Sequence, residues 1–211
     1  MSCEAALSQW LNQYQARYQQ TLHECPRHYS DGEASVCVQG YDAEPVQWRH
    51  VAREQLGSFD NVRNALALEL HTDIDAFYGT HWAGPLHFDA PWGVGELIQV
   101  WNDDDFERLQ QNIIGHLMMK RKLKQAPTWF IGVTEDGEQM LCVKNDDGSV
   151  WLETPGQEPT TQVAESLTEL MQQIRPRVAP AVEYEVETRS DTAHPGLLAS
   201  LKRMWNNLFA K

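Results

Sequence analysis

Histidines and acids that could bind a metal ion lie close together between residues 71 and 89. The imidazoles are His71, His81 and His87, and the carboxylates beside them are Asp73, Asp75 and Asp89. Nitrogen and carboxylate ligands of this kind can hold zinc and activate a water molecule. The histidine spacings of ten and six residues match no standard metal motif. We therefore favour packing or surface roles for these histidines and expect neither a metal nor another cofactor.

Other catalytic signatures are incomplete or missing. The segment Gly93–Ile98 begins like a dinucleotide-binding fingerprint, but its third glycine is absent and a strand pattern follows where a helix is needed. The sequence contains no nucleophile elbow, Walker loop or HExxH motif. His116 lies on the apolar side of a predicted helix, so we expect it to point inward and form a hydrogen bond. The sequence predicts no catalytic residue.

Composition restricts the partners. The 211 residues are 42% hydrophobic and 22% charged, as in globular proteins, and the net charge is −13. Nucleic acid is not an expected partner, because its phosphates are neutralised by patches of Lys and Arg. No apolar run is long enough to span a bilayer, so any membrane contact is expected to be peripheral. The N-terminus lacks signal-peptide features, and four cysteines without a CxxC pair predict free thiols in a reducing cytoplasm.

The negative charge is unevenly distributed. Between residues 60 and 107 there are ten acids and a single base, Arg63, giving a local charge of −9. Such a segment can form a groove that attracts a cationic partner, with the aromatic residues between the acids contributing affinity. The alternative is a solvated face that keeps the protein soluble.

Hydrophobic periodicity predicts the elements that position these residues. Helical spacing indicates helices over 7–22, 59–78, 103–124 and 161–174. Short strands are predicted at 35–38, 46–51 and 96–101, and an antiparallel meander at 129–133, 139–143 and 149–153, where turn sequences containing Gly137 and Gly148 divide the strands. This order favours an α+β fold over a doubly wound parallel sheet.

The last part of the chain has a different character. We predict a domain over residues 1–174 and an extension over 175–211, in which alternation at 182–187 indicates an edge strand or extended arm. A final amphipathic helix follows. Its apolar face includes Leu201, Trp205, Leu208 and Phe209, and it carries three positive charges and no acid. This helix could lie on an anionic membrane, but we favour docking on the body of the protein or on a second subunit.

One central motif resembles a known family. The sequence QVWNDDDFERLQQNIIGHL at 99–117, followed by KLK at 122–124 and PTWFI at 127–131, closely resembles the Syd family of SecY-interacting proteins. Phe77-Tyr78 and Ala83-Gly84 fit the same family, and the resemblance covers roughly residues 1–174. It implies a single α+β domain of the SUKH superfamily, whose other members include immunity proteins that neutralise toxins. The segment from Arg175 lies outside the usual family extent.

The resemblance also implies a function. It indicates a non-enzymatic protein that is cytoplasmic, associates peripherally with the cytoplasmic side of the inner membrane, and monitors or negatively regulates the SecYEG translocon by binding SecY. Cytoplasmic loops of membrane proteins are rich in Lys and Arg, so an acidic surface would complement them. The expected contact residues are Asp73, Asp75, Asp89, Glu96, Asp103, Asp104 and Asp105. Asp104 and Asp105 lie in the matched motif, the others are placed by local charge, and helix capping is the alternative role for Asp103 or Asp104.

Two alternatives belong to other functional classes. One is an immunity protein that blocks a basic, nuclease-type toxin, which the superfamily fold permits. The other is a metal-dependent hydrolase built on the histidines between residues 71 and 89. The sequence leaves the oligomeric state open.

Overall fold

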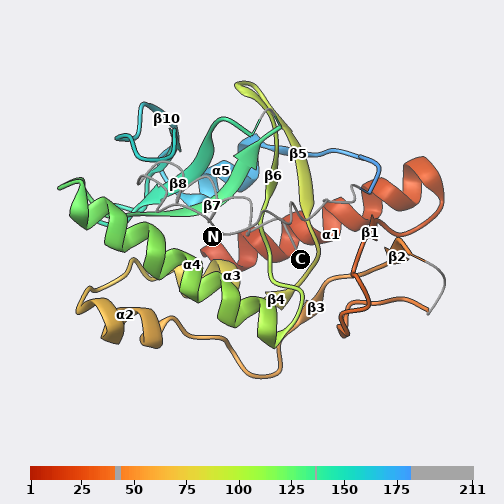
Figure 1. Ribbon diagram of the computed structural model, residues 1–211. Helices are drawn as coiled ribbons and strands as arrows, with labels where there is room; N and C mark the ends of the chain where they lie inside the picture. The colour runs from red at the N-terminus through yellow and green to blue at the C-terminus, as the bar shows by residue number, and fades with distance from the viewer. Residues whose placement is uncertain (41–43, 136, 182–211) are drawn as a thin grey trace, which may run out of the picture.

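The computed structural model describes residues 1–40, 44–135 and 137–181 (Figure 1). The helices are α1 (Cys3–Leu22), α2 (Asp60–Leu66), α3 (Asp73–Tyr78), α4 (Asp103–Lys122) and α5 (Leu167–Gln173). The strands are β1 (Arg27–His28), β2 (Val46–Gln47), β3 (Val51–Ala52), β4 (His81–Trp82), β5 (Leu86–Ala90), β6 (Gly93–Leu97), β7 (Thr128–Thr134), β8 (Met140–Lys144), β9 (Val150–Glu153), β10 (Thr161–Ala164) and β11 (Arg175–Pro176).

The central element is a seven-stranded sheet with the order β10-β9-β8-β7-β6-β5-β11. Two further pairs, β1 with β2 and β3 with β4, form small separate sheets. Every strand pairing in the described part of the chain is antiparallel. The predicted α+β class and the predicted meander of β7, β8 and β9 are therefore confirmed.

The helix predicted over 59–78 is wrong as a single element. Residues 67–72 separate α2 from α3, and Ala67 adopts a left-handed conformation with φ of 47°. The Asn145 side chain pins this connection, because its Oδ1 accepts from the His71 amide at 2.9 Å and its Nδ2 donates to the Glu69 carbonyl at 2.8 Å. These bonds from the β8–β9 turn satisfy backbone groups of the connection, so the apolar periodicity does not continue as one helix.

The helix predicted over 161–174 is wrong in its first part. Residues 161–164 form β10 at the edge of the sheet beside β9, and the helix begins only at Leu167. The Ser166 side chain accepts a hydrogen bond from the Glu169 amide at 3.2 Å, which marks the start of α5. Residues 161–164 pair with the edge of β9, and Ser166 caps α5. These two interactions outweigh the helical spacing of the apolar residues.

The strands before α4 also differ from the prediction. The strand predicted at 96–101 is β6 at 93–97, and β5 was not predicted. A side chain at Gly95 would place its Cβ 2.3 Å from the Val133 carbonyl oxygen, so the glycine permits close strand pairing. In the N-terminal loop, 46–51 is divided between β2 and β3, and the strand predicted at 35–38 is reduced to one bridge between Val38 and Trp48.

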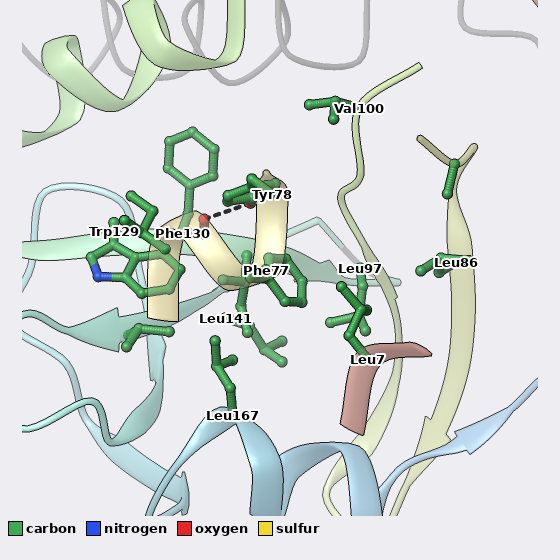
Figure 2. Packing of buried hydrophobic residues seen from close by; sticks show 14 of the residues in the cluster. Leu7, Phe77, Tyr78, Leu86, Leu97, Val100, Trp129, Phe130, Leu141 and Leu167 are labelled. Carbon is green, nitrogen blue, oxygen red and sulfur yellow. Dashed lines mark hydrogen bonds between the residues drawn. The ribbon is translucent and has the colours of Figure 1, made fainter. Parts of the chain in front are cut away.

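The core lies between the sheet and the helices. Figure 2 shows Leu7 of α1, Leu167 of α5 and Phe77 of α3 approaching side chains of β6, β7 and β8. Tyr78 is fully buried, and its hydroxyl donates to the Phe130 carbonyl at 2.9 Å. Burying each large apolar side chain contributes about 1.5–3 kcal/mol. The helix α4 packs along β7 and α2, whereas α1 packs against α3, α5 and β11.

The chain remains attached to this body after α5. Strand β11 pairs with β5, and the backbone of Ala179 donates to and accepts from the Tyr18 hydroxyl at 3.0 Å. The strand or arm predicted at 182–187 and the helix carrying Leu201 and Trp205 lie outside the described residues. None of the helices in the described part of the chain is long and apolar enough to cross a membrane. All four cysteines are free thiols, as predicted.

Candidate functional site

The predicted acidic motif forms the start of α4. Asn102 caps the helix, because its side-chain oxygen accepts from the Asp105 amide at 2.9 Å. The Asp105 carboxylate in turn accepts from the Trp101 amide at 2.8 Å and from Arg108 at 3.0 Å. The cap is therefore Asn102, and not Asp103 or Asp104. Asp105 stabilises the junction, while Asp103 and Asp104 are exposed to solvent.

An open groove of about 650 Å³ lies beside this helix start. Three acids, Glu33, Glu44 and Asp103, line it together with the apolar side chains of Val36 and Trp82. The acids come from the described residues 30–40 and 44–46 and from α4, which lie more than fifty residues apart in the sequence. The groove therefore combines negative charge with an apolar wall.

Hydrogen bonds hold the loop against the strand-to-helix junction. The Ser35 hydroxyl donates to the Trp101 carbonyl at 2.6 Å, and the Asn102 side chain donates to the Ala34 carbonyl at 2.9 Å. Trp101 is almost fully buried, and its indole nitrogen lies 3.4 Å from the Glu33 carbonyl oxygen. These bonds join two distant segments, so the groove is formed by tertiary contacts.

Glu44 carries a fixed negative charge in the groove. Partial burial opposes its ionisation, but hydrogen bonds from the Ser30 hydroxyl at 2.5 Å and the Ser30 amide at 3.0 Å favour the carboxylate. Together with a weaker bond from the Gly32 amide, they lower the pKa of Glu44 below its ordinary value. This acid is therefore ionised at neutral pH.

The wall of the groove already contacts a guanidinium group. The Arg53 guanidinium carbon lies 3.7 Å from the centre of the Trp82 ring and 4.5 Å from that of Phe106. Arg53 also lies 3.7 Å from the Asp103 carboxylate. Aromatic rings and acids attract cations at such distances. The Trp82 ring and the Asp103 carboxylate therefore already have one cationic partner within the protein.

The other four predicted contact residues lie elsewhere. Asp75 forms an ion pair with Arg63 and accepts from the Phe59 amide at 2.8 Å, which fixes α2 against α3. Asp73 lies at the start of α3, partly buried, with its carboxylate 3.9 Å from the His71 ring. These two acids have local structural partners and are not among the groove residues.

The remaining two acids lie on the β5–β6 hairpin. Glu96 is 8% exposed, and its carboxylate is 3.6 Å from the His87 ring of the paired strand. Asp89 is exposed and lies 3.9 Å from Arg177. The seven predicted acids therefore occupy three separate regions, and only the start of α4 contributes to the groove.

The histidines that suggested a metal site have different neighbours. The His71 ring packs against Gly148, and the His81 ring lies 5.9 Å from that of His50. His87 faces Glu96. Within the described residues, the potential ligands of the 71–89 segment form no group of three. This geometry does not support the hydrolase hypothesis.

A different group of potential ligands is buried between α4 and the sheet. Ligand atoms of His116, Cys142 and Glu153 lie within 4.8 Å of one another. However, the Lys120 ammonium lies 3.1 Å from the Glu153 carboxylate and supplies the positive charge there. The Thr128 hydroxyl donates to Glu153 at 2.8 Å and lies 2.9 Å from His116. Protein groups thus already contact the Glu153 carboxylate and His116 Nε2, whereas His116 Nδ1 is buried without a hydrogen-bond partner.

Burial determines the protonation states in this cluster. It lowers the pKa of His116 to about 3 and raises that of the Cys142 thiol well above its ordinary value. His116 is therefore neutral and Cys142 remains a thiol at neutral pH. The inward, hydrogen-bonded position predicted for His116 is confirmed, and the cluster has the features of a structural ion pair.

Comparison with known proteins identifies the family. A sequence model described as Syd protein (SUKH-2) matches residues 4–176. Proteins named Protein Syd from Shewanella sp. (strain MR-7), Shewanella baltica (strain OS223) and Shewanella sp. (strain W3-18-1) are 55%, 53% and 52% identical to this chain over 215 aligned positions. The chain belongs to the Syd family. Each alignment covers all of both proteins, so these Syd relatives also contain a segment aligned with the 175–211 extension.

The groove of this Syd family member contains two acids that sequence reasoning missed. Glu33 and Glu44 lie outside the 60–107 segment in which charge was counted. Their loop contains glycines and prolines and has no regular periodicity, so the sequence offered no signal that it folds onto the start of α4.

Proposed function

We propose that this Syd family protein binds the cytoplasmic loops of SecY through the groove beside α4. The observation that carries this proposal is the combination of Glu33, Glu44 and Asp103 with an apolar wall in one concave surface. Cytoplasmic loops of membrane proteins are enriched in Lys and Arg, so their charge complements this surface. Aliphatic stems of the same side chains can pack against Trp82 and Val36.

Charge and apolar contact have different roles in this proposal. The net charge of −13 and the exposed carboxylates steer a basic partner toward the groove, which mainly raises the association rate. Trp82 and Val36 then exclude water and slow dissociation. Individual exposed charge pairs contribute only about 0.2–1 kcal/mol each.

The protein would act at the cytoplasmic face of the inner membrane as a peripheral component and not as a catalyst. Its binding to SecY would monitor or negatively regulate the SecYEG translocon. Occupation of the basic loops offers a direct physical route, because a loop held in the groove is unavailable to other acidic partners.

The test measures binding of the full chain to SecYEG in neutral detergent. Affinity is expected to fall roughly tenfold between about 50 mM and about 300 mM salt, because ions screen exposed charges. The variant Asp103→Asn/Asp104→Asn is expected to bind about threefold to tenfold more weakly at low salt. Asp105 is left intact because it stabilises the helix start.

The matched control is Glu158→Gln/Glu165→Gln, which removes the same charge from exposed positions outside the start of α4 and outside the groove. The control is expected to bind like the unmodified chain. Binding that is insensitive to salt, or an equal loss for both variants, would remove the groove from the interaction.

A further inference from the structure

The far end of α4 has the opposite character from the groove. Arg121, Lys122 and Lys124 are exposed there, and Met118 and Leu123 are 57% and 37% exposed. We call these five residues the basic patch. Figure 1 shows this end of α4 (darker green) at the edge of the molecule, remote from the end beside β4. Charged and apolar side chains therefore meet at a protruding corner.

The backbone places the patch residues together. Met118, Arg121 and Lys122 are three and four residues apart on α4 and share one face of the helix. Leu123 and Lys124 complete the last turn, and Lys124 adopts a left-handed conformation with φ of 58°. The patch is therefore built on a rigid element and is not a flexible charged run.

Few of its charges are neutralised within the protein. The Arg121 guanidinium donates to the Leu66 carbonyl at 2.7 Å, which holds it at the end of α2. In the described part of the chain, Lys122 and Lys124 form no ion pair. The adjacent connections do carry acids, Glu69 and Asp146, and these limit the attraction for an anionic surface.

We propose that the basic patch contacts the anionic headgroups of a lipid bilayer, with Leu123 and Met118 entering the interface. A bilayer interface accepts both basic and apolar side chains, whereas a soluble polyanion attracts only the basic ones. The exposed apolar side chains among the lysines therefore favour a bilayer as the partner. Each Lys or Arg near such a surface contributes about 1 kcal/mol. Three basic groups therefore give weak binding that orients the protein.

The orientation follows from the length of α4. Its twenty residues span about 30 Å, so the patch and the groove are held at opposite ends of one rigid rod. Lipid contact through the patch keeps the acidic groove away from a surface that would repel it. The relevance of this orientation rests on the proposed SecY binding, whereas the lipid contact itself does not.

The test uses the full chain and lipid vesicles without SecY. Flotation is compared on vesicles containing phosphatidylglycerol and on vesicles of phosphatidylcholine alone. Lys122→Glu and Lys124→Glu are each expected to weaken binding to the anionic vesicles roughly tenfold. Arg17→Glu, an exposed position on α1 with the same change in charge, is the control and is expected to have an effect below about twofold.

A variant at Leu123 measures how much apolar insertion contributes to vesicle binding, separately from the lysines. Leu123→Ser is expected to weaken binding severalfold and to keep this effect at high salt, which screens the lysines but not apolar insertion. Equal binding of the two vesicle types, or no effect of the Lys122, Lys124 and Leu123 variants, would overturn the proposal. Loss of vesicle binding only on deletion of residues 195–211 would also overturn it, because the extension would then be the lipid contact.

The lipid contact of the basic patch and the SecY binding of the groove can be tested independently of each other. If Lys122→Glu binds detergent-solubilised SecYEG normally but loses vesicle binding, the lipid contact is supported separately from the groove. If the patch variants bind vesicles normally while Asp103→Asn/Asp104→Asn loses SecYEG, the basic patch is rejected and the groove proposal stands.

Discussion

The two ends of α4 place charged residues in opposite environments. At the start of the helix, the Asp103 side chain is 89% exposed, although its carboxylate lies 3.7 Å from Arg53. Near the other end, Lys120 is fully buried and paired with Glu153, one residue from the exposed Arg121. The type of a charged residue therefore does not predict the role of that residue in the protein. Burial and local partners decide whether a charge stabilises the fold or faces solvent.

The buried pair should therefore control stability, whereas exposed charges should not. Lys120→Met leaves the Glu153 carboxylate buried without its cation, and we expect a loss of about 3–5 kcal/mol in the free energy of unfolding. Lys122→Met, two residues away and exposed, is expected to cost less than about 0.5 kcal/mol. Urea unfolding monitored by tryptophan fluorescence measures both values.

A paired replacement sharpens this comparison. Lys120→Met/Glu153→Leu removes both charges and should recover much of the loss, because no unpaired buried charge remains. A double variant that is as unstable as the sum of the two single variants would show that Lys120 and Glu153 do not act as a pair.

The buried cluster should also make stability depend on pH. Folded His116 has a pKa of about 3, whereas its ordinary value is 6.5, so only the unfolded chain takes up this proton as the pH falls below 6.5. The stabilisation is complete above pH 6.5 and is lost toward pH 3. His116→Gln should therefore reduce the slope of unfolding free energy against pH by about 1.4 kcal/mol per pH unit between roughly pH 4 and 6.

Identical slopes for the unmodified chain and His116→Gln would contradict a neutral, buried imidazole at position 116.

Local sequence patterns predicted the structure correctly where a helix or strand packs against the core along its whole length. The spacing of Phe106, Leu109, Ile113 and Leu117 predicted α4, and all four side chains are buried. The turns at 135–137 and 145–148 likewise predicted the order of the meander. In these segments, local propensity and tertiary packing favour the same structure.

The predictions failed where distant contacts determine the structure. Bonds from Asn145 separate α2 from α3, and the edge of β9 recruits residues 161–164 as a strand. The site is affected in the same way, because tertiary contacts such as the bond from Ser35 to Trp101 bring Glu33 and Glu44 to the groove that Asp103 also lines. Of the seven acids predicted as contact residues, only Asp103 lines the groove, since local charge does not reveal which acids become buried or paired.

Site-specific photocrosslinking tests the central proposal most directly. A photoreactive side chain at Val36, which is 63% exposed and lines the groove, should form an adduct with SecY in inner-membrane vesicles. The same side chain at the exposed Glu165, after β10, should not. An adduct from Glu165 and none from Val36 would contradict binding of SecY in the groove.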